Sequence, residues 1–305
     1  MVLGSLNLDL VVRVSRLPQT GETVLGGRLG NYPGGKGANQ AVAAARLGGE
    51  AIMVGRVGQD SFGESLVANL ETNGVDASGV GRDPDQPTGA ALIIVEEGGQ
   101  NVIAVAPGAN LAVGRAEVEQ VEQRLHPGDL LVMQLEIPLA TVERAVAVGR
   151  RAGAAILLNA APARSLERSL LRQLDVLVVN QREALVLADQ QKPTAAARML
   201  RAAGPKLVIV TLGADGCIMS DDAGTRTIEP YRVESVDATG AGDAFVGGLA
   251  YGLADQVPPD EAVRLANAAG AAAATAVGAQ EALPRPADLL RLFGLNVSSF
   301  GRRVS

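Results

Sequence analysis

The sequence predicts an α/β fold built on a doubly wound, mostly parallel β-sheet that is flanked by helices. From residue 115 to residue 212, runs rich in Val, Ile and Leu alternate regularly with stretches of helical period. The apolar runs are continuous, which is typical of parallel strands that are covered on both faces. Residues 10–32 and 88–106 are β-rich but fall outside this alternation, so they predict a separate small sheet.

The individual elements follow from the hydrophobic period and from the Gly and Pro residues that interrupt it. We expect strands at residues 1–5, 10–14, 51–57, 88–96, 101–106, 130–134, 154–159, 176–179, 207–212 and 231–236, with further exposed strands within 21–31. We expect helices at residues 40–47, 61–73, 115–125, 139–152, 166–174, 181–188, 194–203, 244–253 and 260–277.

The two β-rich patches are expected to form a lid over the carboxyl ends of the parallel strands, where open α/β sheets bind ligands. No linker or internal repeat divides residues 1–293, so we expect one domain that carries this lid. Residues 294–305 show little pattern and are expected to be a loosely held tail. A sheet this small leaves one apolar face uncovered, and burying it against the same sheet of a second subunit predicts a homodimer.

Composition excludes several classes of protein. The chain has a net charge of −6 and no block of basic residues, which argues against a nucleic acid partner. Cys217 is the only cysteine, so an intramolecular disulfide and a cysteine-cluster metal site are excluded. The sequence has no apolar run of about 18 residues and no charged leader, so we expect a cytoplasmic protein outside the membrane.

Residues 237–243, which read Asp-Ala-Thr-Gly-Ala-Gly-Asp, are the most informative stretch. They precede an apolar helix, where unpaired amides and the helix dipole favour an anion, and Gly240 and Gly242 let a ligand approach those amides closely. Asp243 follows directly, as a carboxylate that could orient and deprotonate an attacking hydroxyl. The alternative is an ordinary turn in which Asp243 caps the helix. The stretch matches neither the dinucleotide-binding fingerprint nor the Walker A loop.

Polar residues also follow several other predicted strands. Asn7 and Asp9 could bind vicinal hydroxyls of a sugar, or could simply form a turn. The loop 34–39 could bring its backbone and Asn39 to a ligand, or could be a lid hinge with a capping Asn. Glu136 follows the strand 130–134 and is expected to face the crevice.

Two further motifs occur at later strand ends. In Asn-Gln-Arg-Glu at residues 180–183, Glu183 could pair with Asn180 as a helix cap, or could hold a hydrated Mg²⁺ that bridges nucleotide phosphates. The Gly-rich turn at residues 211–216 is suited to hold a nucleotide.

With these motifs in order, the chain resembles the ribokinase-like carbohydrate kinase family from residue 1 to about residue 286. The resemblance lies in Gly-Ser-Leu-Asn-Leu-Asp at 4–9, Gly-Gly-Lys-Gly-Ala-Asn-Gln-Ala at 34–41, Met-Gln-Leu-Glu at 133–136, Asn-Ala-Ala-Pro-Ala at 159–163, Asn-Gln-Arg-Glu at 180–183, residues 237–243 and Gly-Ala-Gln at 278–280. It implies ATP-dependent phosphorylation of D-ribose at the 5-hydroxyl, with Asp243 as the base and residues 240–242 as the anion hole. Kinases for deoxyribose, another sugar or a nucleoside, and a non-catalytic sugar-binding protein, are the alternatives. The scarcity of aromatic residues argues against a nucleoside.

The resemblance also implies sets of ligand-binding residues. Ribose would contact Asn7, Asp9, Gly35, Lys36, Gly37, Ala38, Asn39, Glu136 and Asp243. ATP would lie along Asn180, Thr211, Leu212, Gly213, Ala214, Asp215, Gly216, Ala241, Gly242 and Asn267. The Gly240, Ala241 and Gly242 amides would receive the transferred phosphoryl group. Mg²⁺ would be held by Glu183 through water, and a monovalent cation, K⁺, would be held mainly by carbonyls of Asp237, Thr239, Ala273, Ala276 and Gly278.

Two sites, which comprise three residues, depart from the family pattern. Ala238 stands where the family usually has Thr or Ser, so one hydroxyl near the turn is missing. Glu281 and Ala282 stand where the family usually has Pro and Ser, so a Ser side-chain oxygen is missing near the cation.

Overall fold

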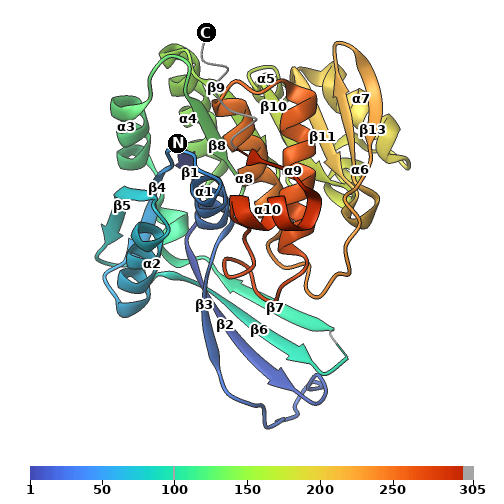
Figure 1. The fold of residues 1–305 in the computed structure, drawn as a ribbon. Helices are drawn as coiled ribbons and strands as arrows, with labels where there is room; N and C mark the ends of the chain where they lie inside the picture. The colour runs from blue at the N-terminus through green and yellow to red at the C-terminus, as the bar shows by residue number, and fades with distance from the viewer. Residues whose placement is uncertain (99, 298–305) are drawn as a thin grey trace.

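The computed structural model describes residues 1–98 and 100–297, which form two β-sheets and their covering helices (Figure 1). The larger sheet has nine strands in the order β13-β12-β11-β10-β9-β8-β1-β4-β5. Their bounds are β1 (Val2–Leu3), β4 (Ile52–Gly58), β5 (Asp76–Asp83), β8 (Leu130–Met133), β9 (Ala155–Asn159), β10 (Val176–Asn180), β11 (Leu207–Thr211), β12 (Cys217–Asp221) and β13 (Gly224–Ile228). The pairs from β5 to β11 are parallel and only the β11-β12-β13 edge is antiparallel, so the predicted fold class is confirmed.

Helices cover both faces of this sheet. One layer contains α1 (Lys36–Arg46), α2 (Ser61–Thr72), α8 (Ala241–Ala254) and α9 (Pro259–Ala273), and α10 (Pro286–Phe293) packs outside α9. The other layer contains α3 (Arg115–Arg124), α4 (Leu139–Ala152), α5 (Arg168–Leu171), α6 (Gln181–Ala188) and α7 (Pro193–Ala203). Neighbouring residues of β9 alternate between the two layers: Leu157 packs in the first, and Ile156 and Leu158 pack in the second. The central strand β9 is therefore apolar on both faces up to its last residue, Asn159.

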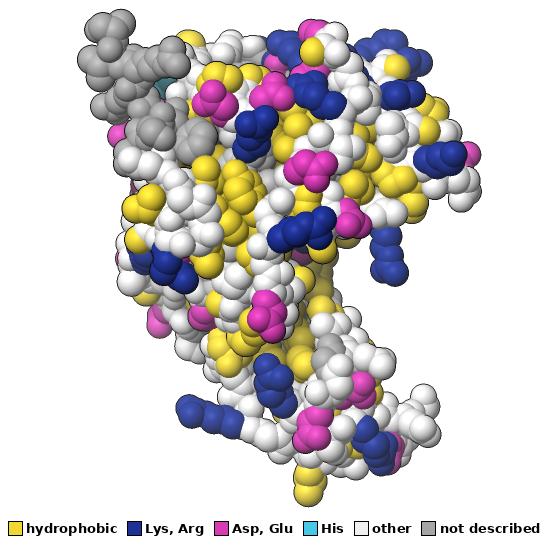
Figure 2. Space-filling model, turned by 45° about the vertical axis from the view of Figure 1, so that its right-hand side comes forward, with side chains coloured by type: hydrophobic (Ala, Val, Ile, Leu, Met, Phe, Trp, Pro, Cys, Tyr) yellow, Lys and Arg dark blue, Asp and Glu magenta, His cyan; other side chains and the backbone are white. Residues whose placement is uncertain are grey.

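The smaller sheet, which we call the lid, has the order β3-β2-β6-β7 and projects from one side of the main body (Figure 1). Its strands are β2 (Asn7–Val14), β3 (Gly30–Gly34), β6 (Gly89–Glu96) and β7 (Asn101–Ala106). Only β2 and β6 pair in parallel. Figure 2 shows the molecule hollowed between this sheet and the main body. The predicted second sheet is thus present.

Helices α1 and α8 pack unusually closely. A Cβ added to Gly247 in α8 would lie 2.3 Å from the Cβ of Ala43 and 2.9 Å from the carbonyl oxygen of Gln40. Backbones can approach this closely only where one residue has no side chain. The contact brings the first turn of α1 next to the first turn of α8.

Several predicted boundaries are wrong for identifiable reasons. The helix expected at 40–47 begins at Lys36, so the first turn of α1 contains residues expected in a loop. The helix expected at 244–253 begins at Ala241, and the one expected at 166–174 shortens to four residues. The helix expected at 260–277 ends at Ala273, because the amides of Val236 and Asp237 donate to the carbonyl of Ala274.

Strand predictions differ mainly at the sheet edges. The sequence does not predict β5, β12 and β13, whose residues include Asp and Gly; β5 and β13 are the two edge strands of the sheet, and β12 is the neighbour of β13. Residues 231–236 form no strand, since the sheet ends at β13 and Pro230 has no amide to donate. Within 21–31 only the last two residues belong to a strand, and the strand expected at 1–5 shortens to Val2–Leu3.

The beginning of the expected tail is well packed. Val297 is 3% exposed and packs with Leu265 of α9 and Leu289 of α10. Residues 298–305 lie outside the described residues. Within the ranges 1–98 and 100–297, no helix combines the length and the hydrophobicity that crossing a membrane requires.

Candidate active site

A cavity of about 230 Å³ lies at the carboxyl ends of β10 and β11, beside the N-terminus of α8. It brings together seven residues that the sequence identified in separate motifs. They are Lys36, Asn180, Glu183, Thr211, Gly240, Gly242 and Asp243. Asn159, Ala161, Val178, Val179, Ala238 and Val246 complete the lining.

The N-terminus of α8 offers backbone amides to this cavity. Gly240 caps the helix with φ of 75°, and a Cβ there would lie 3.0 Å from the Cα of Ala279, so both conformation and space require glycine. The Ala241 amide donates to the carbonyl of Ala238, and the Ala244 amide donates to Gly240. The amides between them belong to Gly242 and Asp243, and they lie in the first turn, where no intrahelical partner exists. This geometry suits an anion.

Asp243 is 6% exposed and is held by two amide side chains of α1. Nδ2 of Asn39 donates to Oδ2 at 2.9 Å, and Nε2 of Gln40 donates to Oδ1 at 2.9 Å. Asn39, expected to point at a ligand, thus contacts the carboxylate instead. Gly37 and Ala38, also expected at the sugar, donate their amides to Oγ and to the carbonyl of Ser5, respectively.

Lys36 lies among carboxylates at the start of α1. Its backbone amide donates to Oε2 of Glu136 at 3.1 Å, and the Ser5 hydroxyl donates to the same oxygen at 2.5 Å. The Asp243 carboxylate raises the pKa of Lys36 most, burial opposes this, and Glu136 and Glu183 add to the rise. The ammonium group therefore keeps its charge inside the crevice.

Asp9 and Asn7 lie on β2, where the lid leaves the main body. Oδ1 of Asn7 accepts from Nδ2 of Asn110 at 2.7 Å. Burial, followed by the charges of Glu136, Asp243 and Glu281, raises the pKa of Asp9 to about 7. This carboxyl group is thus protonated below neutral pH and ionised above it.

Asn180 and Glu183 form a capping box at the start of α6. The amide of Asn180 donates to Oε2 of Glu183 at 2.8 Å, and the Glu183 amide donates to Oδ1 of Asn180 at 2.9 Å. Burial raises the pKa of Glu183. The cap and a metal role are compatible, because the cap uses one carboxylate oxygen and the side chain also lines the cavity.

The expected nucleotide residues lie next to this box. Thr211 pairs with Asn180 across β10 and β11, and the following turn closes with the Leu212 amide donating to the carbonyl of Gly216. Residues 213–215 form a short 3₁₀ turn between them. Nδ2 of Asn267 donates to the carbonyl of Glu229 at 3.2 Å, and the side chain is 8% exposed.

Asp237 joins the two segments that the sequence associates with a monovalent cation. Its Oδ1 accepts from the amide and the hydroxyl of Thr239, and its Oδ2 accepts from the Gly278 amide at 3.0 Å. The turn before α8 and the loop after α9 are therefore fastened together. Ala282 is buried beside this loop with no side-chain oxygen.

Sequence reasoning missed four buried amides as part of the site: Gln40, Gln134, Asn159 and Gln280. Their exposures are 1%, 0%, 8% and 2%, respectively. All four lie inside motifs that the sequence analysis quotes, so the available signal was an amide within a motif to which no role was assigned.

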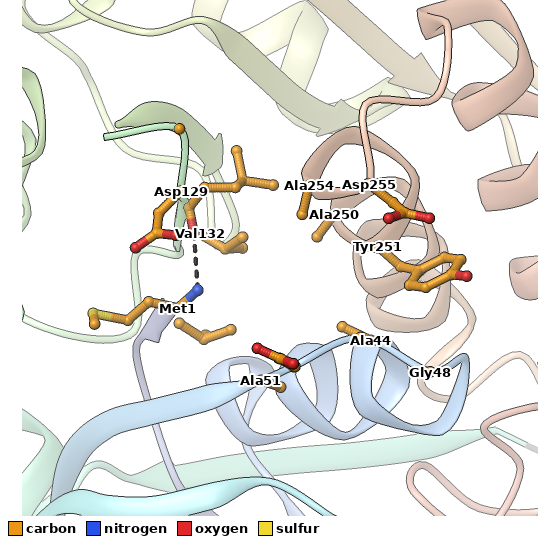
Figure 3. A pocket seen from close by; sticks show the side chains of 15 residues that line it. Met1, Ala44, Gly48, Ala51, Asp129, Val132, Ala250, Tyr251, Ala254 and Asp255 are labelled. Carbon is orange, nitrogen blue, oxygen red and sulfur yellow. Dashed lines mark hydrogen bonds between the residues drawn. The ribbon is translucent and has the colours of Figure 1, made fainter. Parts of the chain in front are cut away.

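A second cavity, of about 530 Å³, lies at the opposite ends of the strands, between the C-terminal ends of α1 and α8 (Figure 3). Met1, Ala51 and Asp129 line it, and the Met1 amino group donates to the carbonyl of Leu130 at 2.9 Å. It is larger than the first cavity but shares no lining residue with it. It holds none of the motifs, so we do not include it in the site.

Comparisons with known proteins agree with this geometry. The chain matches the family model described as pfkB family carbohydrate kinase over residues 1–286. A ribokinase from Haemophilus influenzae is 37% identical over 294 residues, which cover 95% of this chain and 96% of the relative. A deoxyribokinase from Salmonella typhi is 34% identical over 301 residues, which cover 97% and 98%.

Among solved structures, ribokinase from Arabidopsis thaliana complexed with ribose and ATP matches with a TM-score of 0.88 at 28% identity. The match covers 96% of this chain and 98% of that one. Fold, motifs and the family match over residues 1–286 agree, and this chain belongs to the pfkB family of carbohydrate kinases.

Proposed function

We propose that this protein is a ribokinase, which transfers the γ-phosphoryl group of ATP to the 5-hydroxyl of D-ribose. The observation that carries the proposal is the buried Asp243 carboxylate. It lies at the N-terminus of α8, which lines the 230 Å³ cavity, and two amide side chains of α1 donate to it. The resemblance to the Haemophilus influenzae ribokinase supports the choice of sugar.

In the proposed reaction, the 5-hydroxyl oxygen attacks the γ-phosphorus and forms the new O–P bond. The bond between the γ-phosphorus and the β,γ-bridging oxygen breaks, so ADP leaves with that electron pair. The hydroxyl proton passes to Asp243. The backbone amides of Gly242 and Asp243, together with the Lys36 ammonium group, stabilise the charge on the transferred phosphoryl group, while the Ala241 amide is held by the carbonyl of Ala238.

The proposed sugar ligands come from both sheets. Asp9 and Asn7 lie at the base of the lid, while Glu136, Lys36 and Asp243 lie on the main body. The charges of Glu136 and Asp243 act on Asp9, so the three carboxyl groups lie near one another. A sugar with several adjacent hydroxyls could donate to all three. Gly35 would bring its backbone to the same sugar.

We propose that ATP lies along Asn180, the turn at residues 211–216 and Asn267, and that it would bind together with Mg²⁺. Glu183 would hold that ion through water, because Mg²⁺ releases its own waters reluctantly. The donor set fits, since an oxygen ligand lines the cavity beside the amides of α8. When bound, the ion supplies charge neutralisation to the phosphates.

We also propose a K⁺ site formed by carbonyls of Asp237, Thr239, Ala273, Ala276 and Gly278. The hydrogen bond from the Gly278 amide to Asp237 supports this site, because it holds the turn before α8 next to the loop after α9. Oxygen-rich loops of this kind suit a hard cation. Ala282 leaves this set without a side-chain oxygen.

We propose a homodimer that forms through the lid. Strand alternation places Leu92 and Val102 on the lid face opposite to Asp9, and each is 53% exposed. Exposed apolar side chains on a projecting sheet mark an interaction surface. The opposite face carries Asp9 and is free to close over the crevice.

A kinase for deoxyribose is the second candidate, because the Salmonella typhi deoxyribokinase is 34% identical over nearly the whole chain. The two sugars differ by the 2-hydroxyl alone. An ADP-release assay with ribose and 2-deoxyribose at equal concentrations distinguishes the two, and faster turnover of deoxyribose would overturn the proposed substrate.

Asp243→Asn tests the proposed base. The variant is expected to lower kcat for ribose by about 10²–10⁴, the usual contribution of a general base. The measurement is ADP release, with ribose affinity followed by calorimetry. Asp222→Asn, whose side chain is 95% exposed, is the matched control. An Asp243→Asn enzyme that keeps a third of the wild-type kcat would remove this residue from the reaction.

Glu183→Gln separates the metal role from the cap. A glutamine oxygen can still accept from the Asn180 amide, so the melting temperature should change little, whereas the lost charge should raise the Mg²⁺ concentration for half-maximal rate. The measurement is a magnesium titration of kcat. An unchanged titration curve would leave Glu183 as a helix cap alone.

The pKa of Asp9 predicts a pH dependence of sugar binding. Because that pKa is raised to about 7, the carboxylate that accepts sugar hydroxyls forms only as pH rises through neutrality. The KM for ribose should fall by roughly tenfold between pH 6 and pH 8, following the ionised fraction. Asp9→Asn should have a higher KM that no longer changes over this range. Parallel profiles for both enzymes would contradict the assignment.

The lid interface predicts two measurements. Wild-type protein should sediment as a dimer at micromolar concentration, and Leu92→Lys with Val102→Lys should sediment as a monomer, because two charges would be buried at the interface. Met199→Lys, at a residue 50% exposed on α7, should remain a dimer. Ribose should slow hydrogen exchange in residues 10–32 and 88–106. Monomeric wild-type protein would refute the dimer. Equal hydrogen-exchange rates in these segments with and without ribose would refute lid closure.

A further inference from the structure

We propose that buried amide side chains form two hydrogen-bond relays that fix the orientation of Asp243, which makes Gln40 and Gln280 positioning residues for phosphoryl transfer. The proposal rests on the proposed function, in which Asp243 accepts the hydroxyl proton. Each relay ends on a different oxygen of this carboxylate.

The first relay starts after β8. Nε2 of Gln134 donates to Oε1 of Gln40 at 2.6 Å, and Nε2 of Gln40 donates to Oδ1 of Asp243 at 2.9 Å. The second proton on Nε2 of Gln40 goes to Oδ1 of Asn159, at 3.0 Å. Gln40 therefore has a partner for its oxygen and for both of its amide protons, so its side chain has a single orientation.

The second relay starts on α2. Nδ2 of Asn69 donates to Oε1 of Gln280 at 2.6 Å, and Nε2 of Gln280 donates to Oδ1 of Asn39 at 3.0 Å. Nδ2 of Asn39 then donates to Oδ2 of Asp243 at 2.9 Å. The relay thus runs from a surface helix, through the loop after α9, to the carboxylate.

All the amides in both relays donate toward Asp243. Hydrogen bonds in such a chain polarise one another, so each one strengthens the donor that faces the carboxylate. Oε1 of Gln134 has no hydrogen-bond partner among the described residues and is buried. A buried amide oxygen without a partner is unfavourable, so the orientation of Gln134 is set by its donation to Gln40.

The relays have a catalytic consequence because proton transfer requires accurate placement of the base. One amide on each oxygen prevents rotation of the carboxylate, while each oxygen retains a lone pair for the sugar hydroxyl. A small misplacement of a reacting group can lower a rate by about a hundredfold. Gln40 acts by its hydrogen bond to the Asp243 carboxylate and Gln280 acts through Asn39, so in this arrangement both position the base.

The test is a double-mutant cycle on kcat. Gln40→Leu and Gln280→Leu are each expected to lower kcat by about 10- to 100-fold, with KM for ribose and for ATP changed by less than about threefold. In an Asp243→Asn background the same substitutions should cause no further loss, because the group they position is no longer a base. An equal loss of kcat in both backgrounds would overturn the proposal.

Thr141→Val is the matched control, since it removes a buried hydrogen bond to the carbonyl of Val113 that is not part of either relay. It should lower the melting temperature and leave kcat unchanged. If Gln40→Leu does not fold, Asn69→Leu at the partly buried outer end of the second relay replaces it, with a smaller expected loss of kcat. Unchanged kcat in that folded variant would overturn the second relay.

Failure of the proposed substrate and failure of the hydrogen-bond relays give different results. Wild-type enzyme that does not release ADP with ribose would refute the proposed substrate, and the cycle would then use the sugar that is turned over. Active wild-type enzyme whose relay variants keep full kcat would refute the relays alone.

Discussion

The close contact between α1 and α8 is the constraint on which the site depends. Gly247 and Ala43 let the two helix backbones touch, and this brings Asn39 and Gln40 within hydrogen-bond distance of Asp243. The helix that carries Asp243, the proposed base, also presents its N-terminal amides to the cavity. The proposed base and the proposed anion hole therefore have a fixed separation that is set by one helix, and the orientation of the Asp243 carboxylate is set by the neighbouring helix α1.

The lid depends on the same short segments. β1 ends at Leu3 and β2 begins at Asn7, so three residues lead from the main sheet into the lid. The chain returns through β3, which ends at Gly34, and Gly35 alone separates it from α1. Asp9 therefore lies on a lid strand itself, and Lys36 lies at the start of the helix that follows the lid. Movement of the lid would therefore directly change the positions of residues at the proposed sugar site.

The sequence predicted the fold class because buried parallel strands must be apolar on both faces, a signal that survives without tertiary information. It also located the turn at residues 237–243, where glycine and aspartate have few structural alternatives. It did not locate β5, β12 and β13, whose pairing depends on neighbours at the sheet edge. The sequence also did not predict the contact of Gln40 with Asp243, because the two residues are 203 positions apart in the chain.

The close contact between α1 and α8 also limits which parts of such an enzyme can change in evolution. Any side chain larger than hydrogen at position 247 would push the two helices apart, so the catalytic half tolerates little change. Strand β7 of the lid, whose residues are all exposed, has no comparable restriction. Substitutions there leave the contact between α1 and α8 unchanged. This edge of the lid can therefore vary in evolution while the two helices that hold Asp243 keep their arrangement.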